Sequence, residues 1–158
     1  MNNKKVIKWL SYQKKINKIN VTKKNIYNLV NWNFDNNEIK HKSGQFFQVI
    51  GINVVSNFFK KNWDQPIIVQ NENGILGVLR KKIKLKSFYL LQAKAEPGNI
   101  NKIQISPTVQ ATQSNYKRVH GGEKTRFLSY FLKKIFFMKS KQTEQGFRYL
   151  YKYNTNIV

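Results

Sequence analysis

The strongest constraint on the fold is a series of short apolar runs, separated by turn residues, through the middle of the chain. Turn-forming sequences at 71–74 and 97–99 lie between runs rich in Val, Ile and Phe, and each run is too short for an ordinary helix. Such runs, bounded by Gly, Pro and Asn, are typical of strands in an antiparallel or mixed sheet. The expected strands cover residues 45–56, 65–70, 77–85, 87–95, 103–109 (interrupted at Pro107) and 147–153.

Apolar residues at helical spacing flank this β-rich centre. Residues 1–20 form a basic N-terminal segment without acids, which we expect to be a surface helix or a partly ordered arm. Thr22 is a candidate cap for a short helix around 26–30. A broad apolar stripe predicts a longer helix over 125–138, which would cover one face of the sheet. The sequence therefore predicts an α+β fold, with residues 21–158 as one unit after the basic segment.

The positive charge of the chain has two explanations. There are 29 Lys and Arg residues against 7 Asp and Glu, which gives a formal net charge of +22. One explanation is a polyanionic partner, either nucleic acid or an anionic membrane surface. The other is a Lys- and Asn-rich composition of the kind that AT-rich genomes encode. Base and phosphate recognition favours the guanidinium fork, so the scarcity of Arg favours the second explanation, with no nucleic-acid or membrane partner. The arginines are Arg80, Arg118, Arg126 and Arg148.

Several classes of site are excluded by composition. The sequence contains no cysteine, which excludes disulfides, thiolate catalysis and Cys-based zinc sites. His41 and His120 are the only histidines, and the few acids do not complete a metal-binding motif with them. A glycine-rich dinucleotide fingerprint and a P-loop are also absent. No apolar run is long enough to span a membrane, and no apolar signal region follows the first lysines. We expect a cytoplasmic protein without a metal or another cofactor.

One expected strand carries polar and apolar residues in alternation. Strand geometry places Gln92, Lys94 and Glu96 on one face, and the small Ala93 and Ala95 on the other, where a helix could pack closely. The polar row has two interpretations: an ion pair on a solvated face, worth little, or the floor of a binding site. The polar run that follows favours a site for a phosphorylated, polyhydroxylated ligand. That run continues the alternation with Gln110, Thr112 and Ser114, and then holds Asn115, Tyr116, Arg118 and His120.

Several strings of the sequence together resemble one enzyme family. Residues 91–99, Leu-Gln-Ala-Lys-Ala-Glu-Pro-Gly-Asn, look like part of the signature of NDP-hexose 2,3-dehydratases. Residues 106–116, Ser-Pro-Thr-Val-Gln-Ala-Thr-Gln-Ser-Asn-Tyr, resemble another part of it. The resemblance runs from about Val21 to the C-terminus. Further matching strings are residues 32–34, 41–44, 46–47, 63–67, 74–77, 120–121, 142–146 and 154–156.

The resemblance implies a fold, a reaction and a missing part. The implied fold is Nudix-like, and the implied reaction eliminates water across carbons 2 and 3 of a nucleotide-linked 4-keto-6-deoxyhexose. Members of the family carry two related repeats, and this chain resembles one, which we take as the first. The Nudix catalytic box is absent, so pyrophosphate hydrolysis is not implied. Thr155 stands where the family tends to have Arg, which removes one possible phosphate contact.

The elimination needs a base, a group that stabilises an enolate, and an acid for the departing hydroxyl. The resemblance implies Glu96, Glu144 and His120 as candidates for proton transfer. Lys94 or Tyr116 could stabilise the enolate oxygen. These alternatives stay open, because a folding role is as good an explanation for each residue as a catalytic one.

Other matched residues are expected to contact the substrate. Arg118 is the candidate for the diphosphate, and Trp63 could stack on the nucleotide base or simply pack in the core. His120 could equally end a turn before the glycines that follow it. The remaining candidates for substrate binding are Gln65, Gln92, Asn99, Gln110, Thr112, Ser114, Asn115 and Gln145.

Three functions remain open at this level. The first is a sugar-nucleotide dehydratase that works as a homodimer or with a second repeat chain. The second is an inactive or partner-dependent fragment that binds a nucleotide-diphosphate sugar. The third is a Lys-rich module that binds nucleic acid, which tight and specific binding at physiological salt would reveal.

Overall fold

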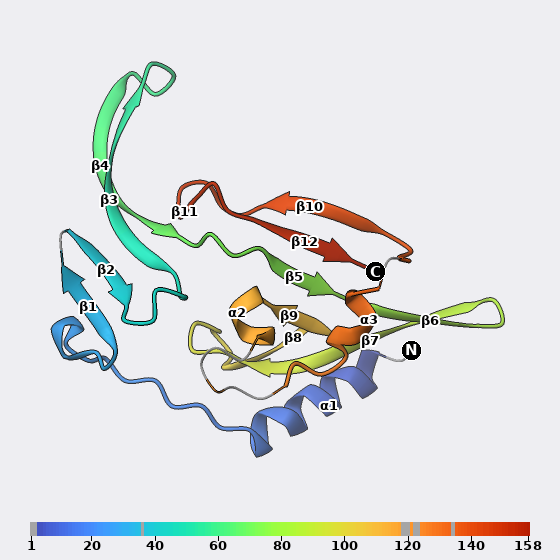
Figure 1. The fold of residues 1–158 in the computed structure, drawn as a ribbon. Coiled ribbons are helices and arrows are strands. Elements are labelled where there is room, and N and C mark those ends of the chain that lie inside the picture. The colour runs from blue at the N-terminus through green and yellow to red at the C-terminus, as the bar shows by residue number, and fades with distance from the viewer. Residues whose placement is uncertain (1–2, 36, 118–120, 122–123, 134) are drawn as a thin grey trace.

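Three small sheets make up most of the structure (Figure 1). The computed structural model describes residues 3–35, 37–117, 121, 124–133 and 135–158. In spatial order, the five-stranded sheet consists of β1 (Trp32–Asp35), β2 (Glu38–His41), β3 (Gln48–Ser56), β4 (Lys61–Val69) and β11 (Tyr149–Leu150). The four-stranded sheet consists of β10 (Lys139–Thr143), β12 (Tyr153–Ile157), β5 (Gly74–Gly77) and β9 (Val109–Ala111). The three-stranded sheet consists of β6 (Leu79–Ile83), β7 (Lys86–Ala95) and β8 (Ile103–Pro107).

The pairing within the sheets confirms an α+β fold with mostly antiparallel strands. Among the described strands, only β11 with β4 and β12 with β5 pair in parallel. The helical elements are α1 (Asn3–Ile16), the 3-10 turn η1 (Ile26–Asn28), α2 (Gln113–Tyr116) and α3 (Leu128–Phe131). The strand between residues 103 and 109 is interrupted at the expected place, because β8 ends at Pro107 and β9 starts at Val109.

The hydrophobic core is small and lies against the four-stranded sheet. The buried cluster consists of Val109, Ala111, Phe131 and Ile157. Gly77 faces this cluster, because a Cβ atom built there would lie 2.3 Å from the Phe131 ring. The ring therefore occupies the space that any other residue at position 77 would need. The partly buried residues that pack on the cluster are Ile75, Leu79, Tyr116, Leu128 and Phe136.

Substitution of Gly77 by Ala is expected to lower the free energy of unfolding by about 2 kcal/mol, because the new methyl group must displace the buried Phe131 ring. Urea unfolding followed by circular dichroism measures the change. Gly98 is the matched control, since nothing lies within 4 Å of a Cβ atom built there. An equal loss of stability in the two variants would contradict the close packing at Gly77.

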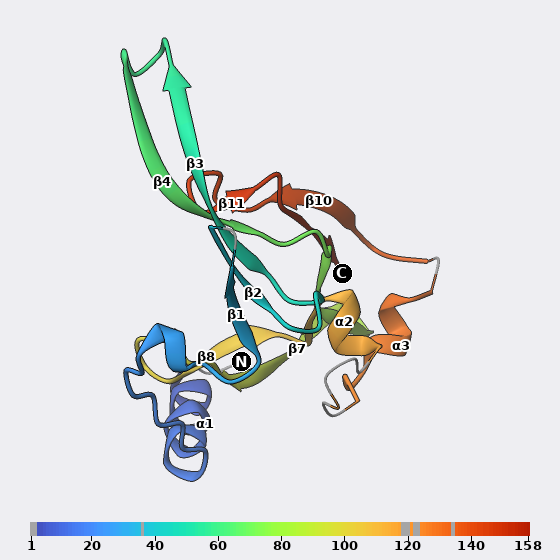
Figure 2. The same cartoon turned by 60° about the vertical axis from the view of Figure 1, so that its left-hand side comes forward.

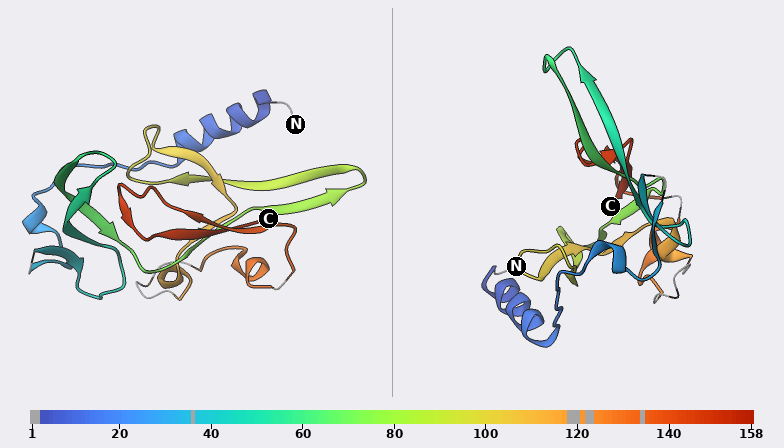
Figure 3. Two further views of the ribbon diagram at one scale, coloured as in Figure 1. Left: turned by 90° about the horizontal axis from the view of Figure 1, so that it is seen from above. Right: turned by 90° about the vertical axis from the view of Figure 1, so that its left-hand side faces the viewer.

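The N-terminal segment forms the expected surface helix. Helix α1 has no buried residue, and it lies alongside β8 (Figure 3).

The register of β7 and β8 pairs Ala93 with Ile105 and Ala95 with Ile103, so the small residues of β7 share a face with the isoleucines of β8. Among the described helices, none is long and apolar enough to cross a membrane.

The prediction of a long helix over residues 125–138 is wrong. Among the described residues of this range, α3 is the one helix that forms, and Phe127 before it has a left-handed backbone with φ of 62°. Further along, the Phe137 and Met138 N–H groups donate to the Val158 carbonyl, and Val158 N–H donates to Met138 in return. Backbone pairing with the C-terminal strand thus replaces the helix, in a segment whose aromatic residues have modest helix propensity.

Two smaller expectations are also corrected. The helix around residues 26–30 is a single 3-10 turn, and its cap is the Asn25 side chain rather than Thr22. The strand expected over 147–153 is divided between two sheets. Tyr151, with φ of 51°, lies between β11 and β12, and this left-handed residue turns the chain from one sheet to the next.

The chain exposes much more surface than a compact domain of its mass. Its accessible surface is 12913 Å², whereas a folded monomer of 18.7 kDa exposes roughly 8,300 Å². Two hairpins contribute to the open shape: β3–β4 extends away from the other elements (Figures 1 and 2), and so does β6–β7 (Figure 1). Many large apolar side chains on them are exposed, among them Phe58, Leu85 and Phe88.

Candidate functional site

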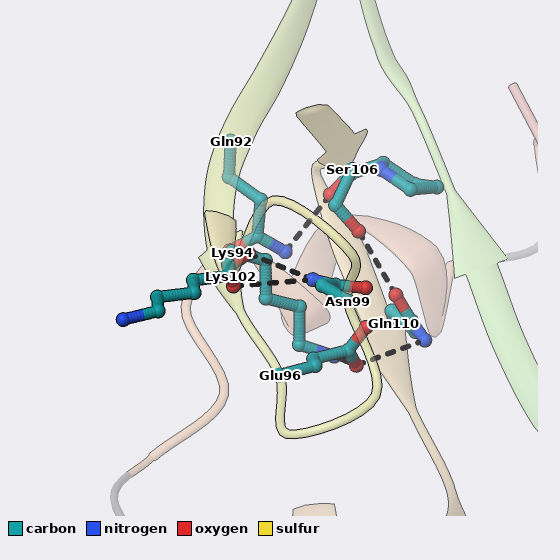
Figure 4. A network of polar contacts seen from close by, with 8 residues as sticks. Gln92, Lys94, Glu96, Asn99, Lys102, Ser106 and Gln110 are labelled. Atoms are coloured by element: carbon teal, nitrogen blue, oxygen red, sulfur yellow. Dashed lines mark hydrogen bonds and ion pairs between the residues drawn. The ribbon is translucent and has the colours of Figure 1, made fainter. Parts of the chain in front are cut away.

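The polar row of β7 meets β9 and the turn after β7, as Figure 4 shows. Glu96 is the centre of these contacts. Its Oε1 atom lies 2.8 Å from the Lys94 ammonium nitrogen and accepts a hydrogen bond of 3.4 Å from the Gln110 amide. Gln110 reaches this point from β9, a different sheet from β7. We call the residues joined in this way the Glu96 network. Its members are Gln92, Lys94, Glu96, Asn99, Ser106 and Gln110.

Neighbouring backbone fixes the rest of the Glu96 network. Gln92 pairs with Ser106 across β7 and β8, so the two side chains share a face, and the Gln92 amide donates to the Pro107 carbonyl at 2.9 Å. The Ser106 hydroxyl donates to the Gln110 side-chain oxygen at 2.9 Å. Asn99 donates to the Lys94 carbonyl at 3.3 Å, which closes the turn. The amides are thus oriented by the protein before any ligand arrives.

The charged pair of the Glu96 network stays partly accessible. The Lys94 side chain is 29% exposed and that of Glu96 is 37% exposed. Water screens such a pair, so it adds little to stability. A carboxylate that can accept a proton therefore lies beside an ammonium group that can donate to an oxygen, with solvent access to both.

A second set of contacts surrounds Glu72, which precedes β5. The Glu72 carboxylate accepts hydrogen bonds from the Ser114 backbone N–H at 3.1 Å and from its hydroxyl at 2.6 Å. Burial acts to raise the pKa of Glu72, but the bonds from Ser114 and Thr112 outweigh it, so the pKa lies below its ordinary value. Lys152 is buried and donates to the Glu72 carbonyl. Ser114 and Thr112 therefore hold the Glu72 loop in place.

The depressed pKa of Glu72 predicts a loss of stability in acid. The hydrogen bonds from Ser114 contribute fully above the ordinary carboxyl pKa of 4.5 and are lost as pH falls through the lowered folded-state pKa. Urea midpoints measured between about pH 7 and about pH 3 should therefore fall less steeply in Glu72→Gln than in the unchanged protein. Glu38→Gln is the control variant, and identical slopes for Glu72→Gln and the unchanged protein would contradict the prediction.

The third set of contacts involves Glu144 and the C-terminal strand. Asn154, which is buried, donates its side-chain N–H to the Glu144 carboxylate. The Asn154 side-chain oxygen accepts from the Gly74 N–H at 3.1 Å. A Cβ atom at Gly74 would lie 2.6 Å from that oxygen, so the contact needs a glycine. Three of the matching strings, around residues 74, 144 and 154, therefore meet in one place.

Trp63 and Gln65 lie in a different sheet from the Glu96 network. They sit on β4, where the Trp63 indole N–H donates to the Gln65 side-chain oxygen at 2.7 Å. The Gln65 amide donates to the Phe147 carbonyl at 2.8 Å, and the Trp63 and Phe147 rings stack with centroids 6.4 Å apart. None of the hydrogen bonds among the described residues joins this pair to the Glu96 network.

The other expected site residues lie in several places. Tyr116 packs against the hydrophobic core, while Asn115 and Gln145 are exposed. Arg118 and His120 lie outside the described residues. The strand-like alternation expected through Ser114 is wrong beyond Ala111, because residues 113–116 form α2 and Thr112 is its N-cap residue. A turn of helix replaces the strand, and it directs Ser114 at Glu72.

Four polar residues of these clusters were not among the expected site residues: Glu72, Ser106, Lys152 and Asn154. Asn154 lies in one of the strings that resemble the family. Ser106 could have been found, because correct pairing of the expected strands places it opposite Gln92. Glu72 and Lys152 had no such signal. They are far apart in the sequence and belong to no motif, and only the fold brings them into contact.

The comparison with known families identifies the family of the chain. The family model for NDP-hexose 2,3-dehydratase matches residues 3–158. This chain belongs to the NDP-hexose 2,3-dehydratase family. The expected boundary at residue 21 between a basic segment and the repeat stays a prediction, as does the cytoplasmic location.

Three curated relatives in the family share one name. The dTDP-4-dehydro-6-deoxy-alpha-D-glucopyranose 2,3-dehydratase of Streptomyces violaceoruber is 38% identical over 95% of this chain and 35% of its own length. Its counterpart in Amycolatopsis orientalis is 35% identical over 95% of the chain and 34% of its own length. That of Saccharopolyspora spinosa is 43% identical over 82% of the chain and 28% of its own length. The chain thus spans about a third of the length of the curated relatives it matches.

Proposed function

We propose that this chain is one part of a sugar-nucleotide 2,3-dehydratase, a hydro-lyase of deoxysugar biosynthesis, built on a Nudix-like fold. The observation that carries the proposal is the contact of Glu96 with Lys94 and Gln110, on partly exposed positions within a chain of this family. The proposed substrate is a dTDP-4-keto-6-deoxyhexose. Two roles stay predictions: binding of the diphosphate by Arg118 and stacking of Trp63 on the nucleotide base.

The proposed reaction needs only proton transfers. The ketone at carbon 4 acidifies the proton on carbon 3, and removal of that proton gives an enolate. The electron pair then forms the double bond between carbons 2 and 3, and the hydroxyl of carbon 2 leaves as water after it gains a proton. These steps transfer no electrons to or from a cofactor.

We assign the proton transfers to Glu96 and the stabilisation of the enolate oxygen to Lys94. A carboxylate beside an ammonium group suits the two roles, because the base and the stabiliser must approach adjacent carbons of one sugar. Protonated Glu96 can then pass its proton to the departing hydroxyl. Glu144 is the less favoured base, because its carboxylate already accepts a hydrogen bond from the buried Asn154.

We also propose that the site is completed by association, either with a second copy of the chain or with a second repeat. The support is the excess of exposed surface and the coverage of about a third of each relative. A fragment that binds the sugar nucleotide without turnover is the second candidate, favoured by the same short coverage.

Incubation with dTDP-4-keto-6-deoxyglucose in deuterated water, followed by proton NMR of the sugar, tests the proposal. Loss of the carbon 2 hydroxyl, or exchange of the carbon 3 proton for deuterium, is the expected result. Binding without either change would favour the fragment. If the chain neither bound the sugar nucleotide nor exchanged its proton, the proposal would be wrong.

A further inference from the structure

A pocket lined by cations and aromatic rings lies at the base of the β6–β7 hairpin. Its walls come from the start of β6, from α3 and the residues after it, and from the end of β12. Figure 1 shows these segments together near the C-terminus. The pocket has a volume of about 550 Å³, which suits a small organic ligand. The lining residues used below are Arg80, Lys82, Tyr130, Lys133 and Phe137.

Two contacts fix the guanidinium group of Arg80 in this pocket. Its central carbon lies 4.0 Å from the centroid of the Phe137 ring, a cation–π contact. Its Nε and Nη2 atoms donate to the Ser87 hydroxyl on β7, at 3.2 and 3.0 Å. Among the described residues, none accepts a hydrogen bond from Nη1. A guanidinium group that is held in place with N–H groups to spare is well suited to phosphate oxygens.

The cations of the pocket have no acidic partner among the described residues. The lining contains no Asp or Glu side chain. The Lys133 nitrogen lies 5.3 Å from the centroid of the Tyr130 ring, and neither Lys133 nor Lys82 forms an ion pair with a described residue. Val158 also lines the pocket, and it forms no ion pair with the three cations. Cations that converge without counter-charge favour an anionic ligand.

The aromatic rings favour a ligand that also has a flat part. Tyr130 is 53% exposed and Phe137 is 72% exposed, so both rings are accessible from solvent. Nucleobases stack on exposed aromatic rings, and such stacking tolerates different bases. A small inorganic anion would use the cations alone and leave the rings in water. Rings and cations in one pocket therefore favour a nucleotide, with its phosphates at Arg80.

Arg80 is too far from Glu96 to hold the diphosphate of a sugar on which Glu96 acts. Arg80 pairs with Tyr89 in the register of β6 and β7, and Glu96 lies seven residues further along the chain than Tyr89. At the rise of a strand this separation is roughly 23 Å. The diphosphate of a sugar nucleotide is bonded to carbon 1 of the sugar, close to carbon 3. One substrate molecule therefore cannot place its diphosphate at Arg80 and its sugar at Glu96.

We propose that this pocket is a second site, which binds a free nucleoside diphosphate reversibly. Arg80, Lys82 and Lys133 hold the diphosphate, and the base lies against the ring of Tyr130. The inference goes beyond the dehydratase proposal, because the site uses no residue of the Glu96 network and its ligand undergoes no reaction. Binding at the site should weaken as salt is added, since salt screens the attraction between the cations and the phosphates.

Calorimetric titration of the whole chain with dTDP, the nucleotide of the proposed substrate, tests the site. Arg80→Met should weaken the binding of dTDP roughly thirtyfold, because it removes the positioned guanidinium group and leaves an apolar side chain. If the unchanged protein shows two binding events, Arg80→Met should lose one and keep the other. Lys133→Gln, at an exposed position, should weaken the same event about fivefold.

Arg148→Met is the matched control for Arg80→Met. It also removes one guanidinium group, but Arg148 is exposed in the turn before β11, and its side chain has no contact with a described residue. The affinity for dTDP should stay within about twofold in this variant, because it changes only the net charge. Circular dichroism spectra show whether each variant is folded, and Lys133→Gln tests the site even if Arg80→Met is not.

Three results would overturn the inference. The first is no binding of dTDP by the unchanged protein. The second is an equal effect of Arg80→Met and Arg148→Met, which would show that the nucleotide is attracted by net charge alone. The third is inorganic diphosphate that binds as tightly as dTDP, since the rings would then contribute nothing. Failure of the dehydratase proposal is a separate result, because Glu96→Gln should leave the Arg80-dependent binding unchanged.

Discussion

Replacement of Glu96 by Gln is expected to slow deuterium exchange at carbon 3 of the sugar at least about a hundredfold. The amide keeps the shape of the carboxylate and can still bond to Gln110, but it cannot accept the proton. Binding of the sugar nucleotide should change little, because the rest of the Glu96 network is intact. The measurement is the NMR exchange rate at saturating substrate, together with calorimetric binding.

Glu38→Gln provides the matched control for that substitution. Glu38 also forms an ion pair with a lysine, Lys40, but it does so on β2, outside the Glu96 network. Exchange in this variant should stay within about twofold of the unchanged protein. If Glu96→Gln also retained its exchange rate, Glu96 would not be the base, and Glu144→Gln would be the next variant to measure.

Replacement of Lys152 by Ala is expected to lower the free energy of unfolding by about 3 kcal/mol, the largest stability effect that we expect. Lys152 is 5% exposed, and its ammonium group donates to the Glu72 carbonyl. Burial lowers the pKa of Lys152, while Glu144 and Glu72 oppose that change. The substitution removes a packed side chain and leaves a carbonyl and two carboxylates without their cation.

Urea unfolding of Lys152→Ala and Lys141→Ala separates this effect from a general effect of charge. Both variants lose one positive charge, but Lys141 is exposed on β10, so its removal should change stability by less than about 0.5 kcal/mol. Lys152→Met, which keeps most of the volume, should recover part of the loss. Similar unfolding midpoints for the two alanine variants would show that the buried cation is not needed.

The Glu96 network was largely predictable from the sequence. Alternation along β7 and one residue past its end places Gln92, Lys94 and Glu96 on one face, because strand geometry repeats every second residue whatever the surroundings. The same rule failed after Ala111, where a helical turn begins and Ser114 binds Glu72. Local periodicity does not account for the hydrogen bonds that Ser114 donates to Glu72, a carboxylate far away in the sequence.

Long apolar stripes were a poorer guide. The residues 125–138 have helical spacing, yet Met138 pairs with Val158 and Phe131 fills the space beside Gly77. Both partners are distant in sequence, so the competition between a helix and these contacts cannot be judged locally. Local order did not decide the sheet of Trp63 either, which lies on β4, in a different sheet from β7.

The sequence by itself determined the family, the strand-rich α+β character and the row of polar residues on β7, because each depends on local order along the chain. Only the tertiary structure decided which residues from other strands reach Glu96, that Lys152 lies buried beside Glu72, and that apolar side chains of the β3–β4 hairpin, Val55 and Phe58, face solvent. Those features depend on contacts between segments far apart in sequence, whose free energies arise only once the chain has folded.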